Sequence, residues 1–186
     1  MKKILFSFLI TLPMVGYADT CGVNNELLCQ QAKSGDAAAQ RSIGWMYSGG
    51  HEVKQDYHQA RIWFEKAVEQ EDAPAQAMLA VMYFDGKGVK QDYHKAKVLF
   101  EKAAKQGHVD AQFILAAMYY QGQGVQQDYQ QAKIWFEKAA KQDHAAAQAR
   151  LGGLYYLGKG VRQDYYQAAK WTKKLHKKVI WKPRID

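Results

Sequence analysis

The sequence repeats itself every 36 residues, and this period restricts the chain to a repeat architecture. The octapeptide GKGVKQDY at 86–93 returns as GQGVQQDY at 122–129 and as GKGVRQDY at 158–165, with a divergent copy, GHEVKQDY, at 50–57. One glycine-rich loop followed by lysine can bind phosphate. Four copies at a fixed spacing, without a preceding strand or a Lys-Ser or Lys-Thr pair, indicate the turn of a repeat instead.

Each unit carries two apolar stripes with helical spacing. In its first half the apolar positions fall at offsets 0, 4, 7 and 8, as in Ala75, Leu79, Met82 and Tyr83. In its second half they fall at offsets 0, 3, 4 and 7, as in Ala96, Leu99, Phe100 and Ala103. Each set lies on one face of an α-helix, and no stretch shows the sustained period of two expected of a strand. One helical hairpin cannot bury both stripes, so neighbouring units must stack.

The octapeptide supplies the signals that separate the two helices. Its glycines end the first helix, and we expect the valine that follows them to be buried. Its aspartate caps the second helix, and a glutamine three residues on predicts a capping box at Gln59, Gln131 and Gln167. Small residues on the first helices permit close helix approach: Gly44, Ala80, Ala116 and Gly152.

We therefore predict an all-α protein, a right-handed α-solenoid of about four 36-residue helix-turn-helix units with terminal capping helices. The predicted units span 36–71, 72–107, 108–143 and 144–179. A capping segment with a cysteine pair occupies 19–35, and a basic tail occupies 180–186.

The first 18 residues have the composition of a secretory signal peptide. Lys2 and Lys3 precede an apolar stretch at 4–15, and the small residues Gly16 and Ala18 predict cleavage after Ala18. That apolar stretch is shorter than the roughly 20 residues that span a bilayer. We expect a soluble product without a transmembrane anchor, retained in a bacterial periplasm or secreted.

The two cysteines, Cys21 and Cys29, would then meet an oxidising compartment, which predicts a disulfide. On one helix they would lie about 12 Å apart, whereas a bridge needs Cα atoms within roughly 7 Å. The segment that starts at Cys21 must therefore leave the helix of Cys29 and fold back on it. A redox-active pair is the alternative, although the spacing is not Cys-x-x-Cys.

The positive charge of the chain is concentrated near its C-terminus. The formal net charge is +8, and the segment 170–186 holds seven Lys or Arg residues and one acid. One hypothesis is a solubilising capping helix, and the other is contact with an acidic partner or an anionic envelope surface. The secretory signal disfavours nucleic acid. The candidate residues of this basic tail are Lys170, Lys173, Lys174, Lys177 and Lys178.

Catalytic motifs do not emerge from the sequence. It contains no Ser-x-x-Lys in the mature chain, no Gly-x-Ser-x-Gly and no His-Glu-x-x-His. His108 and His144 share one repeat position and are interpreted as a tolerated polar face, with a metal site as the alternative. We expect no enzyme activity, no cofactor and no metal.

One unit, AQAMLAVMYFDGKGVKQDYHKAKVLFEKAAKQG at 75–107, resembles the Sel-like repeat family (SLR), a branch of the tetratricopeptide superfamily. The markers are the Ala-Gln opening, the Leu-x-x-Met-Tyr stripe, the Gly-x-Gly-Val turn, Gln-Asp-Tyr and the Phe-Glu-Lys-Ala-Ala close. The resemblance covers roughly residues 34–176. The first unit departs at Gly50-His51-Glu52 and the last at KWTKKL, as terminal capping units do.

The resemblance implies that the first helices line a concave surface. Positions off the recurring stripe vary most between units, and several of them are aromatic. We interpret them as a binding groove, with packing between adjacent first helices as the alternative. The candidate groove residues are Arg41, Trp45, Phe84, Phe113, Tyr120 and Tyr156.

The family also implies a class of function: an exported, non-enzymatic, monomeric interaction module that acts as an adaptor or scaffold. Its partner would be a peptide or protein, with an envelope or host-cell protein as the expected class, and relatives in some pathogens influence host contact. The alternative is penicillin-binding or β-lactamase-like activity, as in cysteine-rich relatives. Those relatives carry a cysteine pair in nearly every repeat, whereas this chain has one pair in total.

Overall fold

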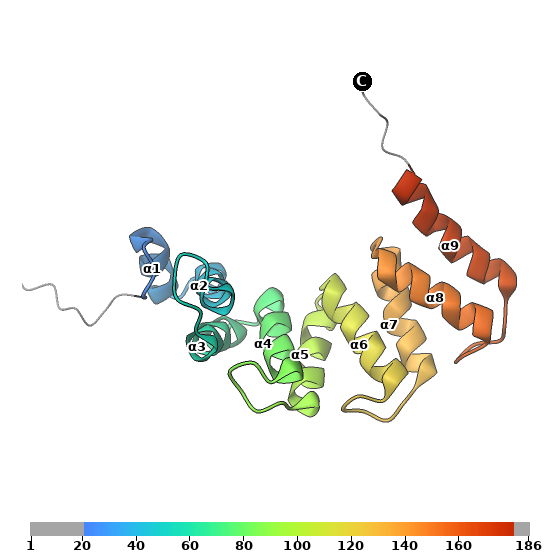
Figure 1. Ribbon diagram of the computed structural model, residues 1–186, viewed down its shortest axis with the longest axis horizontal. Helices are drawn as coiled ribbons and strands as arrows, with labels where there is room; N and C mark the ends of the chain where they lie inside the picture. Colours follow the sequence, from blue (N-terminus) through green and yellow to red (C-terminus); the bar gives the residue numbers. More distant parts are fainter. Residues whose placement is uncertain (1–20, 181–186) are drawn as a thin grey trace, which may run out of the picture.

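The computed structural model describes residues 21–180, with side chains as far as Lys173. Within that range the chain folds into nine helices and no strand, and the hairpins follow one another along an arc, which confirms the predicted all-α solenoid (Figure 1). The predicted signal peptide at 1–18 and residues 181–186 of the tail lie outside the described residues. The helices are α1 (Glu26–Lys33), α2 (Ala37–Gly49), α3 (Tyr57–Val68), α4 (Ala73–Asp85), α5 (Tyr93–Lys105), α6 (Val109–Gln121), α7 (Tyr129–Lys141), α8 (Ala145–Leu157) and α9 (Tyr165–Ile180).

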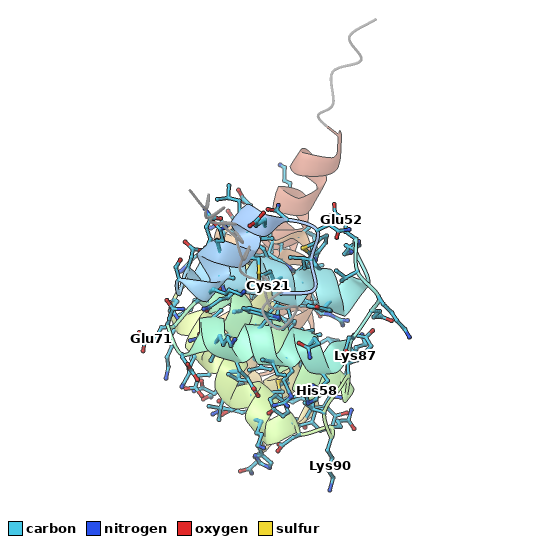
Figure 2. The ribbon with its side chains drawn as sticks, turned by 90° about the vertical axis from the view of Figure 1, so that its left-hand side faces the viewer. Cys21, Glu52, His58, Glu71, Lys87 and Lys90 are labelled. Atoms are coloured by element: carbon cyan, nitrogen blue, oxygen red, sulfur yellow. A yellow bond between two sulfur atoms is a disulfide. The ribbon has the colours of Figure 1, made fainter. Side chains whose placement is uncertain are left out.

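Four hairpins, α2–α3, α4–α5, α6–α7 and α8–α9, form the repeating units. The predicted caps are present: the side chains of Asp56, Asp92 and Asp128 accept backbone N–H groups of the following helix. Each first helix ends in a glycine in the left-handed region, for example Gly86 at φ 72°. Figure 2 shows Glu52 and Lys87, from turns within units, on one side of the solenoid and Glu71, from a turn between units, on the opposite side.

The second glycine of the Gly-x-Gly turn connects neighbouring units, a role that the sequence did not reveal. A Cβ on Gly124 would lie 2.6 Å from Cβ of Tyr93 and 2.8 Å from its carbonyl oxygen. Gly88 and Gly160 pack in the same way against the tyrosine of the unit before them. The first unit has no preceding hairpin, so Glu52 occupies the equivalent place at φ 59°.

Two predicted details of the turn are wrong. The backbone N–H of Asp56 donates to the carbonyl of Tyr47 at 3.0 Å, and the other units make the equivalent bond. That N–H is the group a capping-box glutamine would need, so the turn itself satisfies it. The valines, such as Val53 and Val89, are half-buried and line surface pockets, because the turn lies at the open edge of its hairpin.

Phenylalanines on the second helices form the centre of the core. Phe64, Phe100 and Phe136 are each 1% exposed. They pack against the small residues of the first helices: a Cβ on Gly44 would lie 2.7 Å from the ring of Phe64. The close helix approach expected from these small residues is therefore present.

A ladder of buried glutamines runs through the solenoid. In Gln40, Gln112 and Gln148 the side-chain Nε2 donates to the backbone carbonyl of the residue eight positions earlier, at 3.0 to 3.1 Å. In Gln40, Gln76 and Gln112 the side-chain Oε1 accepts a hydrogen bond from Nε2 of the glutamine thirty residues later, at 2.9 to 3.0 Å. The ladder ends at Gln148, whose buried Oε1 has no hydrogen-bond partner among the described residues. The corresponding residue, Lys178, lies on α9, which continues as helix beyond the point where α7 ends.

The N-terminal end is closed by α1 and by the Cys21–Cys29 disulfide, whose Cα atoms are 5.6 Å apart. Both cysteines are buried, and α1 begins only at Glu26, so the preceding segment folds back on the helix of Cys29. The Tyr47 hydroxyl donates to the carbonyl of Cys21 at 2.8 Å. Burial, and secondarily the charge of Asp56, raises the pKa of Tyr47. The disulfide therefore holds a cap over the first hairpin.

Replacing both Cys21 and Cys29 with serine is expected to reduce the free energy of unfolding by about 2–3 kcal/mol, the loop-closure value for so short a segment. Urea denaturation of the oxidised protein and of the double variant measures the difference. The same loss should follow when the unmodified protein is reduced. A double variant as stable as the oxidised protein would contradict a stabilising role for the bridge.

Candidate functional site

A pocket of about 450 Å³ lies between α2 and α4 on the first-helix surface. Trp45 is 47% exposed there, and Met78 contributes exposed apolar surface from the next unit. The Trp45 ring stacks on His51, with centroids 4.1 Å apart and planes 13° from parallel. The indole is thus held in one orientation while much of its surface remains open. The pocket is lined by Asn25, Arg41, Ser42, Trp45, Met46, His51, Glu52, Pro74 and Met78.

Arg41 also lines this pocket, from the same helix as Trp45, and is itself fixed. Its guanidinium forms an ion pair with Asp72, the residue whose side chain caps α4. The pair joins the first and second units and leaves the arginine side chain 30% exposed. Arg41 therefore presents a positioned donor beside the apolar surface of Trp45.

Three other candidate groove residues form aromatic pairs within their own hairpins. Phe84, Tyr120 and Tyr156 occupy one repeat position, and each meets the tyrosine that opens the second helix edge to face. The centroid distances are 5.1, 5.2 and 5.4 Å. Phe84 and Tyr120 are half-buried, whereas Tyr156 is 57% exposed. Their first role is packing between the two helices of a unit.

Tyr120 is further covered by the turn of the following unit. Lys159 Nζ donates to the Tyr120 hydroxyl at 3.1 Å and lies 5.1 Å from the ring centroids of Tyr120 and Tyr129. The hydrogen bond to Tyr120 is the largest cause of a raised Lys159 pKa. The surface of this unit is therefore occupied by the protein's own lysine.

Phe113 is likewise half-buried, against Phe136 and the imidazole of His144, with ring centroids 5.6 and 4.6 Å away. His144 caps α8: its Nδ1 accepts from the backbone N–H of Ala147 at 3.1 Å. His108 caps α6 in the same way. The two histidines thus replace the capping aspartates of earlier units. Among the described residues no group of three His, Cys, Asp or Glu side chains is placed to hold a metal ion.

The structure thus brings Arg41 and Trp45 together in one pocket and places Tyr156 in another, between α8 and α9. Phe84, Phe113 and Tyr120 line neither pocket. His51, Pro74 and Met78 also line the first pocket, and they were not predicted from the sequence. The departure at Gly50-His51-Glu52 was a usable signal, because His51 places an imidazole ring where the other units carry lysine or glutamine.

The basic tail residues lie on α9. Lys170 and Lys173 are exposed and line a pocket of about 870 Å³ with Tyr155, Tyr166 and Trp171. Glu137 lies at the edge of that pocket, where the Lys141 ammonium lowers its pKa most, with Lys133 contributing. The backbone of α9 extends through Lys174, Lys177 and Lys178, whose side chains are not described. No helix of the described chain is both long enough and apolar enough to cross a membrane.

Stacked two-helix units with a capped N-terminal end and open surface pockets define an α-helical repeat protein. The family model described as Sel1 repeat matches residues 37–72, 73–108, 109–144 and 145–175. The chain belongs to the Sel1 repeat family, whose members generally serve as protein–protein interaction modules.

Similar proteins come from several bacteria. Over 69 residues the chain is 39% identical to the secretory immunoglobulin A-binding protein EsiB of Escherichia coli O6:H1, a match covering 36% of this chain and 14% of EsiB. The chain is 40% identical to c5321, a protective antigen present in uropathogenic Escherichia coli strains, and superposes on its crystal structure with a TM-score of 0.81. That match covers 84% of this chain and 33% of c5321. A Sel1 repeat protein from Oxalobacter formigenes is 31% identical with a TM-score of 0.79, over 82% of this chain and 63% of that one. The chain therefore spans less than two thirds of each of these relatives.

Proposed function

We propose that the protein is an exported interaction module that binds a peptide or protein on its first-helix surface, with the pocket of Arg41 and Trp45 as the anchor. The observation that supports this most is the state of Trp45, which is held by His51 yet about half exposed beside a fixed arginine. Tryptophan and arginine are the residues that contribute most to interface hot spots, and a residue held in place before binding loses little entropy on binding.

The relatives support a partner outside the cytoplasm. EsiB is by its name a binder of secretory immunoglobulin A, and c5321 is described as a protective antigen. A disulfide in the capping segment also suits an oxidising compartment. The proposal therefore includes export through the predicted signal peptide and a partner on the envelope or the host cell.

Site-specific photocrosslinking in cells that export the protein tests this proposal. A photoreactive residue replaces Met78, which is 40% exposed and lines the pocket. The matched control replaces Val98, which is 51% exposed on α5 and does not line it. We expect a discrete adduct, identified by mass spectrometry, from position 78 and none from position 98.

Adding Trp45→Ala should lower the yield of the adduct by about tenfold, because the exposed indole that the partner would cover is lost. Phe84 and Tyr120 are left unchanged, since their rings pack inside the hairpins. Replacing Lys173, Lys174, Lys177 and Lys178 with glutamine should leave the adduct unchanged. An adduct that survives Trp45→Ala but disappears with the glutamine variant, or at high salt, would transfer the binding site to the basic tail.

The proposed role is non-enzymatic, with binding as the whole activity. The alternative of a β-lactamase-like activity can be checked directly on purified protein. Hydrolysis of a chromogenic cephalosporin at a rate above that of a sample with Trp45→Ala and Arg41→Ala would contradict the proposal.

A further inference from the structure

Another pocket, of about 530 Å³, lies between α8 and α9. These two helices form the C-terminal end of the solenoid (Figure 1). Its lining is almost wholly apolar or small. This terminal groove is formed by Ala149, Gly152, Gly153, Tyr156 and Leu157 of α8 with Tyr165, Ala168, Ala169 and Thr172 of α9.

The groove exists because the last unit has small residues where the unit before it has large ones. Thr172 stands 36 residues after Phe136, and Ala149 stands 36 residues after Phe113. In the third unit those two phenylalanine rings lie 5.6 Å apart and fill the space between α6 and α7. Gly153 adds to the opening, since a Cβ placed on it would meet no atom within 4 Å.

The rim of the groove is more apolar and more exposed than the same positions in the other units. Leu157 is 57% exposed at the position held by Gly49, Asp85 and Gln121 in the other units. Tyr165 is 60% exposed, whereas its counterparts are half-buried under the glycine turn of a following unit. This end is thus the same surface on which each internal unit receives the first helix of the next one. Residues 21–173 leave it open, and the smaller side chains make it deeper.

The charge of this unit differs from that of its neighbour. Residues 145–173 contain five basic side chains and one acidic one, and the acid, Asp164, caps α9. The corresponding residues 109–137 of the third unit contain one basic and three acidic side chains. The positive charge of this unit would therefore favour a ligand that carries acidic residues on both sides of an apolar stripe.

We propose that the terminal groove binds an amphipathic helix of a partner protein, with apolar residues spaced as in the chain's own first helices and acidic residues beside them. The model for this contact is internal: α8 packs on the third unit through Ala147, Leu151 and Leu154, at offsets 0, 4 and 7. This site is separate from the pocket of Arg41 and Trp45 and does not depend on the function proposed for it.

A second copy of the chain is the less favourable occupant. Two C-terminal ends would bring together two clusters of basic residues. An N-terminal end cannot stack there as a fifth unit, because Glu52 occupies the place of the packing glycine and α1 covers the first hairpin. Charge and shape therefore both favour a different protein.

The test uses the mature chain and a stapled helical peptide with the sequence of residues 109–121 between added glutamates. Fluorescence anisotropy of the labelled peptide should show saturable binding. The affinity should fall by about tenfold or more in Gly153→Leu, which fills the open space. Thr172→Phe restores the ring on which the other units receive the next first helix, so this variant should still bind the peptide. Gly44 and Phe64 already form the same glycine–phenylalanine contact, so Thr172→Phe is expected to fold.

Three controls make the result specific. Tyr166→Ala removes an aromatic side chain of α9 that is 77% exposed and does not line the groove, and it should leave the affinity unchanged. A peptide with asparagine at the positions of Leu115 and Met118 should bind at least about tenfold more weakly. Raising salt from about 0.05 to about 0.5 M should weaken binding by screening the glutamates.

The proposal is overturned if the peptide does not bind, or if its affinity for Gly153→Leu equals its affinity for the unmodified protein. Sedimentation equilibrium checks the other occupants. Self-association that disappears in Gly153→Leu would assign the groove to a second copy. An affinity that rises about tenfold when residues 181–186 are removed would assign it to the chain's own end. Failure to find an adduct that depends on Trp45 would not change the peptide affinity of the terminal groove. The two proposals can therefore be rejected independently of each other.

Discussion

Replacing Phe100 with alanine is expected to lower the free energy of unfolding by about 3–5 kcal/mol. The ring is 1% exposed and packs in the cluster that joins the second and third units, with the Phe84 ring 6.4 Å away. Because helices on both sides are held by their neighbours, they cannot close fully over the missing ring, and a cavity remains. Urea denaturation followed by far-UV circular dichroism measures the loss.

Val98→Ala is the matched control on the same helix. Its side chain is 51% exposed, so its truncation should change stability by no more than about 0.5 kcal/mol. In a solenoid the loss at Phe100 should also weaken coupling between the two ends and broaden the transition. A loss below about 1.5 kcal/mol would mean that the units do not depend on this ring for their stacking.

Gly124→Ala should have the second large effect, because it acts on the contact between units. The residue has φ 67°, and an added Cβ would lie 2.6 to 2.8 Å from backbone and Cβ atoms of Tyr93. Left-handed strain of about 1–2 kcal/mol then adds to about 1–3 kcal/mol for displacing the preceding unit. The expected total is about 2–5 kcal/mol.

Gly107→Ala separates the two contributions. Gly107 also has a positive φ, 93°, but a Cβ there would meet nothing within 4 Å. It should therefore show the backbone strain alone, about 1–2 kcal/mol. Equal losses in the two variants, measured by the same denaturation, would show that close approach between units contributes nothing.

The fold was largely predictable because its main determinants are local. Helix ends depend on residues within one turn of the boundary, so Asp92 and Gly86 could be placed from the sequence alone. The buried glutamines were harder. Gln76 and Gln112 recur at the unit period, but a polar side chain gives no sign of burial until the carbonyl eight residues earlier is brought beside it.

The candidate site was predictable only in part, because variable positions can serve either packing or binding. Arg41 and Trp45 lie in a pocket, but the ring partners of Phe84 and Tyr120 come from across the hairpin. Those pairings depend on which faces of two helices meet, and periodicity does not reveal that. The terminal groove was not predicted because it arises from the absence of a ring: Thr172 stands where the other units carry phenylalanine.

The contact between a turn glycine and the tyrosine of the preceding unit also bears on how such a chain evolves. A unit that supplies both residues can follow, or be followed by, any other unit that supplies them, as the second and third units do. Duplication or deletion of a whole 36-residue segment would preserve this glycine–tyrosine contact at every remaining junction. The first unit, with Glu52, is excluded from this exchange and can only lead. This contact therefore allows the number of 36-residue units to change, whereas the unit with Glu52 stays first.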